Sequence, residues 1–195
     1  MAFASQGITA QVVPAGHLRL PASILSIGAF DGVHRGHRTV LQSAIGEAKA
    51  QRLPAVVWTF DPPPKVFFER AEPLMVLNDR LARISALGPD YIVLASFTAA
   101  YATQSATGFL SDLANVGPRR IHVGANFRFG AGQTGDCGLL ARHFSVALHN
   151  LVTCAAGEVI SSSRIRALRK SEDMTGACAF LNDDEAASPV CAVVQ

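Results

Sequence analysis

The sequence has little of several features that would indicate a specialised class of protein. Only 16% of its 195 residues are charged, and the formal net charge of +2 gives no reason to expect a nucleic-acid surface. The pattern His-Glu-x-x-His is absent, and no metal site is expected. The cysteines form no Cys-x-x-Cys pair and no zinc spacing, so we expect reduced, mostly buried thiols in a cytoplasmic protein. These cysteines are Cys137, Cys154, Cys178 and Cys191.

Long apolar runs are also missing. Proline, glycine or a charged residue interrupts each run before it reaches the roughly 20 residues that a membrane helix needs. Residues 1–20 lack the basic start and unbroken apolar middle of a signal peptide. What is abundant is apolar core material, because 49% of the residues are hydrophobic. A single domain of ordinary size is therefore predicted, with neither membrane nor nucleic acid as a partner; the sequence carries no signal for the oligomeric state.

Short apolar segments alternate along the chain with segments of helical periodicity. Strands are predicted at 23–30, 55–60, 91–97, 121–123 and 146–154. Helices are predicted at 38–51, 77–87, 105–115, 136–144 and 161–170. This order predicts an α/β fold, a Rossmann-like doubly wound parallel sheet with right-handed crossovers.

Polar residues and prolines mark several expected boundaries. Asn78 or Asp79 is expected to cap the helix at 77–87, and Ser105 or Thr107 the helix at 105–115. Three consecutive prolines follow Asp61, so a semi-rigid loop is predicted over residues 61–70. Such a loop would lie at the carboxyl edge of the sheet, where open α/β sheets bind ligands.

The segment from Ile27 to His37 predicts a phosphate site. It follows the first predicted strand and opens a helix near residues 35–37, whose unpaired N–H groups favour anions. Gly36 has no side chain to keep a phosphate from the backbone. His34 and His37 are three residues apart, so both can lie on one helix face and reach the same oxygens.

Two common phosphate-binding patterns are absent from this first turn, Gly-x-Gly-x-x-Gly and Gly-x-x-x-x-Gly-Lys-Ser/Thr. The two imidazoles, the helix start and the Ser/Arg-rich start of the last predicted helix would have to hold the phosphates instead. The remaining histidines are expected to be solvated or packed. They include His17, His122, His143 and His149. Phe127 and Phe129, bracketed by glycines, suit a binding loop as well as a core, and both possibilities stay open.

Four motifs, in order along the chain, match one family. They are Ile27-Gly-Ala-Phe-Asp-Gly-Val-His-Arg-Gly-His37, Thr59-Phe-Asp-Pro-Pro-Pro64, Val123-Gly-Ala-Asn-Phe-Arg-Phe-Gly130 and Ile160-Ser-Ser-Ser-Arg-Ile-Arg166. On these residues the chain resembles the adenylyltransferase module of the bacterial bifunctional riboflavin kinase/FMN adenylyltransferases, or FAD synthetases. The first and last motifs occur across the wider nucleotidyltransferases of the His-x-Gly-His type, and the middle two point to the flavin branch.

The resemblance implies a reaction in which ATP and FMN, with Mg²⁺, give FAD and pyrophosphate. It implies catalytic roles for His34, His37 and Arg166. It assigns ATP binding to Gly28, Phe30, Asp31, Gly32, His34, His37, Ser161, Ser162, Ser163 and Arg166. It assigns FMN binding to Thr59, Asp61, Pro62, Pro63, Asn126, Phe127 and Arg128.

The chain departs from the family pattern in three respects. Pro63 stands where relatives usually carry histidine, and Ala125 where they commonly carry a polar residue. The nucleotidyltransferase domain is expected over residues 1–182, with a short tail at 183–195 in which nothing resembles the start of a riboflavin kinase, so kinase activity is not expected. Two alternatives stay open: transfer to another phosphorylated acceptor, and a non-catalytic nucleotide- or flavin-binding protein.

Overall fold

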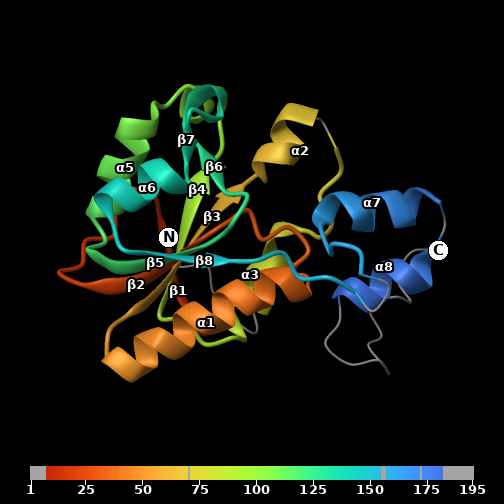
Figure 1. Ribbon diagram of the computed structural model, residues 1–195, viewed down its shortest axis with the longest axis horizontal. Coiled ribbons are helices and arrows are strands. Elements are labelled where there is room, and N and C mark those ends of the chain that lie inside the picture. The colour runs from red at the N-terminus through yellow and green to blue at the C-terminus, as the bar shows by residue number, and fades with distance from the viewer. Residues whose placement is uncertain (1–7, 70, 155–156, 172, 182–195) are drawn as a thin grey trace.

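The centre of the molecule is a six-stranded sheet in which all neighbouring strands are parallel (Figure 1). The computed structural model describes residues 8–69, 71–154, 157–171 and 173–181. The strand order is β1-β4-β3-β2-β5-β8. These strands are β1 (Gln11–Pro14), β2 (Ser23–Ile27), β3 (Ala55–Asp61), β4 (Tyr91–Ser96), β5 (Pro118–Gly124) and β8 (Val146–His149). The predicted parallel α/β sheet is confirmed.

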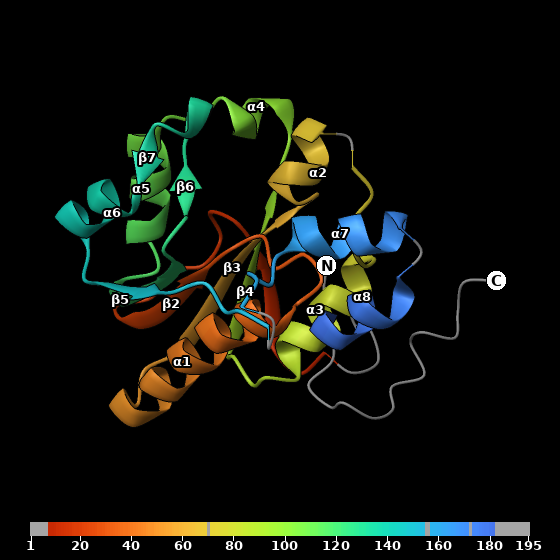
Figure 2. The same ribbon diagram turned by 45° about the vertical axis from the view of Figure 1, so that its right-hand side comes forward.

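Helices cover both faces of the sheet, as Figure 2 shows for α1 and α5. On one face, α1 (Arg35–Gln51) and α3 (Leu77–Ser85) bury Leu41 and Leu81 against the strands. On the other face, α5 (Ala106–Ala114) and α6 (Cys137–His143) bury Phe109 and Leu140. Burial of apolar side chains on both faces is the doubly wound arrangement that the sequence predicts.

Smaller elements complete the described part of the chain. They are α2 (Pro64–Glu69), α4 (Ala99–Ala102), β6 (Arg128–Phe129), the 3-10 turn η1 (Ala131–Gln133), β7 (Gly135–Asp136), α7 (Ser162–Lys170) and α8 (Met174–Leu181). Strands β6 and β7 form a separate antiparallel pair. Helices α7 and α8 share a small apolar core with Leu74, and Arg83 Nη1 of α3 donates a 3.2 Å hydrogen bond to the Leu181 carbonyl. No helix among the described residues has the length and apolar character to cross a membrane.

The loop predicted over residues 61–70 is wrong in part, because it contains helix α2. Pro64 occupies the first helical position, where a fixed φ is suitable and the missing N–H leaves no bond unmade. The backbone N–H of Phe67 then donates a 3.0 Å bond to the Pro63 carbonyl. The prolines therefore start a short helix instead of preventing one.

Three further predictions need correction. Helix α3 is capped by Val76 without a side-chain bond, and Asp79 lies inside its first turn rather than before it. Strand β8 ends at His149, earlier than predicted, and β5 is longer, beginning at Pro118. The edge strand β1 was not predicted. In contrast, Ser105 caps α5 by accepting a 3.0 Å bond from the Gly108 N–H, one of the two caps expected.

The thiols that the structure describes are only half-buried, which corrects the expectation of mostly buried thiols. They belong to Cys137 and Cys154. The side chain of Cys178, the whole of Cys191 and the tail at 183–195 lie outside the described residues.

Candidate active site

A cavity of about 890 Å³ opens at the carboxyl ends of the parallel strands. Strands β2 and β5 are neighbours in the sheet. Beyond β2 lie β3 and then β4, and on the other side of β5 lies β8. The chain thus changes direction across the sheet between β2 and β5, and such switch points are where open α/β sheets bind ligands. The volume lies within the range of small-molecule and cofactor sites.

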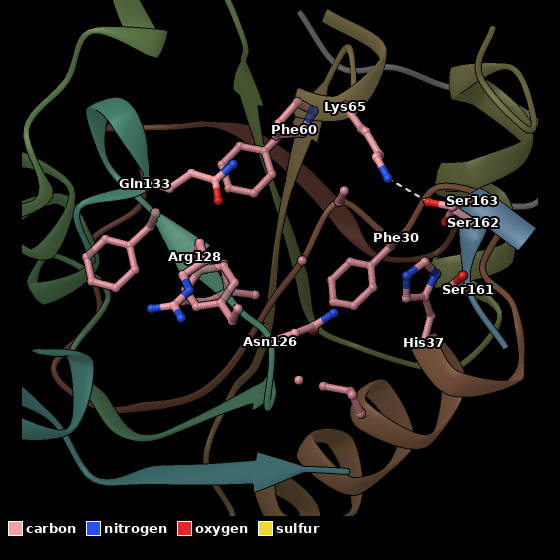
Figure 3. A pocket seen from close by; sticks show the side chains of 18 of the residues that line it. Phe30, His37, Phe60, Lys65, Asn126, Arg128, Gln133, Ser161, Ser162 and Ser163 are labelled. Atoms are coloured by element: carbon pink, nitrogen blue, oxygen red, sulfur yellow. Dashed lines mark hydrogen bonds between the residues drawn. The ribbon is translucent and has the colours of Figure 1, made fainter. Parts of the chain in front are cut away.

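A pair of stacked histidines stands at the N-terminus of α1, on one side of the cavity. His34 is the N-cap, and its Nδ1 accepts a 3.4 Å hydrogen bond from the backbone N–H of His37. The two rings are stacked with centroids 3.6 Å apart. The ring of Phe30 meets the His37 ring edge-on at 5.4 Å, and Figure 3 shows the two side by side at the cavity. A Cβ on Gly36 would lie only 3.3 Å from the His34 ring, so glycine allows this ring to pack against the helix start.

Both histidines are neutral at neutral pH. Burial lowers the pKa of His34 to about 4. Burial, followed by the neighbouring His34 and Arg80, lowers the pKa of His37 well below its ordinary value. Because His34 Nδ1 accepts a bond, its single proton sits on Nε2, which is then a donor. His37 Nδ1 is buried with no partner among the described residues, as expected where a ligand completes the hydrogen bonding.

The serine-rich start of α7 lies beside the histidines and also lines the cavity. Ser161 caps the helix by accepting a 3.3 Å bond from the Arg164 N–H. Ser162 Oγ donates a 2.9 Å bond to the Asp31 carbonyl, and Lys65 Nζ of α2 donates a 2.6 Å bond to Ser163 Oγ (Figure 3). Two helix N-termini therefore meet at one cavity, and their unpaired N–H groups favour an anion there.

Asp31 and Arg166 are placed directly behind this wall, and neither is among the described residues that line the cavity. Their side chains form an ion pair, and Asp31 Oδ1 also accepts a 2.9 Å bond from the Leu74 N–H. Arg166 Nε donates a 3.0 Å bond to the Glu72 carbonyl. Burial raises the pKa of Asp31, against the Leu74 bond and the Arg166 charge. Gly32 also lies outside the lining and faces Leu74 and Leu181.

The opposite side of the cavity has an aromatic wall with a polar rim. The aromatic side chains are Phe60, Phe97, Tyr101, Phe109, Phe127 and Phe129. Arg128 and Gln133 stand at the rim across the cavity from His37, and Asn126 lies between them and His37, near Phe30, in the view of Figure 3. Phe127 and Phe129 stack at 5.6 Å. Phe129 is buried in the core and lines the cavity as well, so the two possibilities left open for these phenylalanines hold together.

The residues predicted to hold FMN separate into two groups. Asn126, Phe127 and Arg128 line the cavity. The other four are not among the described lining residues; they are Thr59, Asp61, Pro62 and Pro63. Thr59 is buried and its hydroxyl donates a 3.0 Å bond to the Ala29 carbonyl, and Asp61 is paired with Arg80.

Sequence reasoning missed several residues that line the cavity. They include Lys65, Tyr101, Gln104 and His149. Lys65, Tyr101 and Gln104 belong to the segments that follow the carboxyl ends of β3 and β4, and His149 is the last residue of β8. Their position at the carboxyl edge of the sheet could have identified them from the sequence as lining residues, because open α/β sheets bind ligands at that edge whatever the residue type.

Comparison with known proteins gives a consistent result. A family model described as FAD synthetase matches residues 18–164. A relative from Geobacillus thermodenitrificans, named "Putative bifunctional riboflavin kinase/FMN adenylyltransferase", is 42% identical over 151 residues, which cover 77% of this chain and 84% of the relative. The "Bifunctional riboflavin kinase/FMN adenylyltransferase" of Escherichia coli K12 is 36% identical over 152 residues, covering 73% of this chain and 49% of that protein. The chain thus matches about half the length of the latter.

Two other matches add to this picture. An "FAD synthetase" of Listeria monocytogenes is 30% identical over 158 residues, covering 75% of this chain and 63% of that protein. A crystal structure titled as a macrolide-efflux protein from Streptococcus pneumoniae superposes with a TM-score of 0.76 at 24% identity, covering 87% of this chain and 59% of that one. The structural likeness speaks for the fold alone.

Proposed function

The chain belongs to the FAD synthetase family of nucleotidyltransferases, and from that premise we propose that it transfers the AMP group of ATP to the phosphate of FMN. The products are FAD and pyrophosphate. One observation carries the proposal: the neutral pair His34 and His37 and the start of α7 gather anion-binding groups on one side of a cavity whose other side is aromatic. Phosphates suit the first side and a planar flavin ring suits the second.

The reaction asks the protein mainly for positioning. An oxygen of the FMN phosphate attacks the α-phosphorus of ATP in line, and the bond from this phosphorus to the bridging oxygen breaks as pyrophosphate leaves. The attacking phosphate is already an anion, so no side chain has to form a covalent bond. Stabilising the charge on the transferring and leaving phosphates is therefore the principal catalytic task.

We assign this charge stabilisation to donors around the two helix starts. His34 offers its Nε2–H, and His37 offers an imidazole that lacks a partner at one nitrogen. Ser161 and Ser163 offer hydroxyls to the β- and γ-phosphates. Ser162, whose hydroxyl donates to the Asp31 carbonyl, offers its backbone N–H at the start of α7. Arg166 adds positive charge from behind the wall, where it also neutralises Asp31. His34 and His37 are thus the proposed catalytic residues. Arg166, which does not line the cavity, is a proposed positioning residue that acts through Asp31.

The remaining nucleotide contacts are proposed around the end of β2. Phe30 would lie against the nucleoside, and Gly28 permits this because a Cβ there would stand 2.8 Å from the Phe30 ring. Asp31 and Gly32 would shape the same turn from behind the wall. For FMN, Asn126, Phe127 and Arg128 would contact the ring and phosphate directly. The segment that holds Thr59, Asp61, Pro62 and Pro63 would form the base beneath them.

Mg²⁺ is proposed to arrive with ATP. No three side chains of His, Cys, Asp or Glu cluster as a metal site in the described part of the chain. Such a site is not needed, because Mg²⁺ in nucleotide enzymes is commonly held by phosphate oxygens and water. When bound it would neutralise phosphate charge. The proposed setting is the cytoplasm, with ATP and FMN as substrates and neither nucleic acid nor membrane as a partner.

A direct test is to incubate the purified protein with ATP, Mg²⁺ and FMN and to separate the flavins by chromatography. A parallel reaction contains riboflavin, which has no phosphate to attack the nucleotide. FAD is expected from FMN, with an equal amount of pyrophosphate, and not from riboflavin. Absence of FAD in the FMN reaction, with the protein folded, would contradict the proposed activity.

A further inference from the structure

Two histidines outside the phosphate site form a hydrogen-bonded chain that ends at the cavity. His122 is buried on β5, and its Nε2 lies 2.9 Å from Glu47 Oε2 of α1. Its Nδ1 lies 2.9 Å from His149 Nε2. The parallel register pairs Gly124 with His149, so His122 and His149 lie on the same face of the sheet. His149 is half-buried and lines the cavity.

The chemistry of Glu47 fixes the direction of every hydrogen bond in this chain. A carboxylate only accepts, and Glu47 also receives a 2.8 Å bond from Gln51 Nε2 and has Arg120 at 3.8 Å. His122 must therefore donate from Nε2. Burial lowers the pKa of His122 and that of His149, which favours neutral rings. Neutral His122 has no second proton, so its Nδ1 accepts and His149 donates from Nε2.

These hydrogen-bond directions also fix the role of His149 Nδ1, the last nitrogen in the hydrogen-bonded series. His149 has used its single proton, so its Nδ1 carries a lone pair and is an acceptor; no described residue provides a hydrogen-bond partner for it. Around His149 the cavity is lined from the same face of the sheet by Gly36 and Val40 of α1, and next in sequence by Leu151 and Val152. The aromatic wall with Phe109 belongs to the other face. His149 therefore lies on the side of the cavity that holds the helix start and its histidines.

We propose that His149 is a specificity-determining residue whose Nδ1 accepts a hydrogen bond from the exocyclic amino group of adenine, with His122 and Glu47 as positioning residues that fix its tautomer. The inference rests on the proposed function in taking ATP as the nucleotide. The base of ITP carries an oxo group in place of the amino group. Its oxygen is an acceptor, as is His149 Nδ1, so the two cannot form a hydrogen bond. His149 therefore distinguishes adenine from hypoxanthine by the direction of the hydrogen bond that each base can make, rather than by the shape of the base.

The test is calorimetric titration of ATP and of ITP, each with Mg²⁺ and without FMN, into the folded protein. The wild type is expected to bind ATP more tightly than ITP by about tenfold, the magnitude of one hydrogen bond matched or mismatched. His149→Leu should bring the two dissociation constants close together, chiefly by weakening ATP. His149→Asn keeps a polar group whose amide can turn either way, so ATP affinity should largely survive while the preference over ITP falls.

The positioning residues have a separate readout. In Glu47→Gln the amide can donate as well as accept, so the tautomer of His122 is no longer fixed and the ATP-to-ITP preference should fall, although residue 47 touches no ligand. Arg120→Gln removes the more distant partner of Glu47 and keeps the carboxylate, so it should leave the preference unchanged. A purely structural role would weaken both nucleotides equally.

The outcomes separate this inference from the proposed activity. A folded His149→Leu protein that keeps the wild-type ATP-to-ITP preference, or that loses only FMN affinity, overturns the inference even where FAD is formed. Conversely, a preference that collapses in His149→Leu and in Glu47→Gln supports it even where no FAD is formed, because binding is measured without turnover.

Discussion

The guanidinium of Arg80 donates a 3.0 Å hydrogen bond to Asp61 Oδ1 from a side chain that is 1% exposed. The same Nη2 donates a 2.9 Å bond to the Phe60 carbonyl, and Nη1 lies 3.4 Å from the Ala29 carbonyl. One buried cation from α3 therefore ties together the ends of β2 and β3 beneath the cavity. Burial lowers the pKa of Arg80, and the Asp61 and Asp31 charges oppose that change.

Removing this cation should destabilise the fold. We expect Arg80→Met to lower the free energy of unfolding by about 3 kcal/mol, because it leaves the half-buried Asp61 carboxylate without its guanidinium partner and removes a donor from the buried Phe60 carbonyl. Urea denaturation measures the loss. Arg142→Met, at an exposed position on α6, is the control and should change stability by less than about 0.5 kcal/mol. Equal effects of the two substitutions would contradict a structural role for Arg80.

Turnover should depend strongly on His37. We expect His37→Ala to lower the rate of FAD formation about 100-fold, equivalent to about 2.7 kcal/mol of transition-state stabilisation, because a donor to the phosphates is lost. The melting temperature, measured on the same sample, should show a folded protein. His17→Ala, at an exposed histidine that is not among the described residues lining the cavity, should be fully active. Unchanged turnover in His37→Ala would rule out the proposed role.

Stability should fall in acid because of His34. Its pKa is about 4 in the folded protein against 6.5 for an ordinary histidine, so the unfolded state binds the proton more readily. The stabilisation from keeping His34 neutral is complete above about pH 6.5 and is lost as the pH falls toward 4, by about 3 kcal/mol in all.

The corresponding measurement is urea denaturation at pH 7.5 and 4.5, for the wild type and for His34→Asn. Asparagine keeps an N-cap acceptor for α1 but does not titrate. The variant should lose about 2 kcal/mol less than the wild type between the two pH values. Parallel losses in the two proteins would show that His34 is not responsible for the acid sensitivity.

Affinity for the acceptor should depend on Arg128 more than affinity for the nucleotide does. Arg128 stands at the cavity rim beside the aromatic wall and pairs with Asp136 at 3.2 Å, with about half of each side chain exposed. We expect Arg128→Ala to weaken FMN about tenfold, through loss of a charged hydrogen bond, and ATP less than about twofold. Separate titrations of the two substrates decide the question, with Arg142→Ala as control. Equal losses would refute an FMN-specific role.

Two glycines should respond to alanine with opposite signs. Gly117 has φ +56°, and a Cβ there would lie 2.5 Å from the Leu20 carbonyl oxygen, so Gly117→Ala should destabilise by about 2 kcal/mol or more. Gly46, inside α1, has open space around it, so Gly46→Ala should stabilise by about 0.5 to 1 kcal/mol. Thermal melting of both variants checks the signs, and a stabilising Gly117→Ala would contradict the close approach at this turn.

The long periodic elements of the fold could be predicted from the sequence. The apolar residues that recur at helical spacing along α1 are all buried; they are Val40, Leu41, Ala44, Ile45 and Ala48. Short elements could not be predicted in the same way. Strand β1 is four residues long, lies at the sheet edge and is at most partly buried, so it carries no clear alternation. Helix α2 was not predicted because the run of prolines that precedes and begins it is typical of a loop.

The candidate site was predictable where its parts are local in sequence. The pair His34 and His37 and the serines before α7 each sit within one motif, and the structure brings both motifs to one cavity. The chain from Glu47 through His122 to His149 was not predictable. It depends on the register of β5 with β8 and on the face of α1 that meets the sheet, and single-residue patterns contain neither.

The two sides of the cavity have different origins along the chain. The rim and part of the aromatic wall come from one uninterrupted stretch, residues 124–133, whereas the anion-binding side joins residues 28–37 to residues 160–163 from far along the sequence. A single loop exchange could therefore replace much of the part proposed to meet the acceptor and leave the two helix starts intact. In such a layout, altering one segment could change the acceptor while the phosphate chemistry proposed for the two helix starts stays the same.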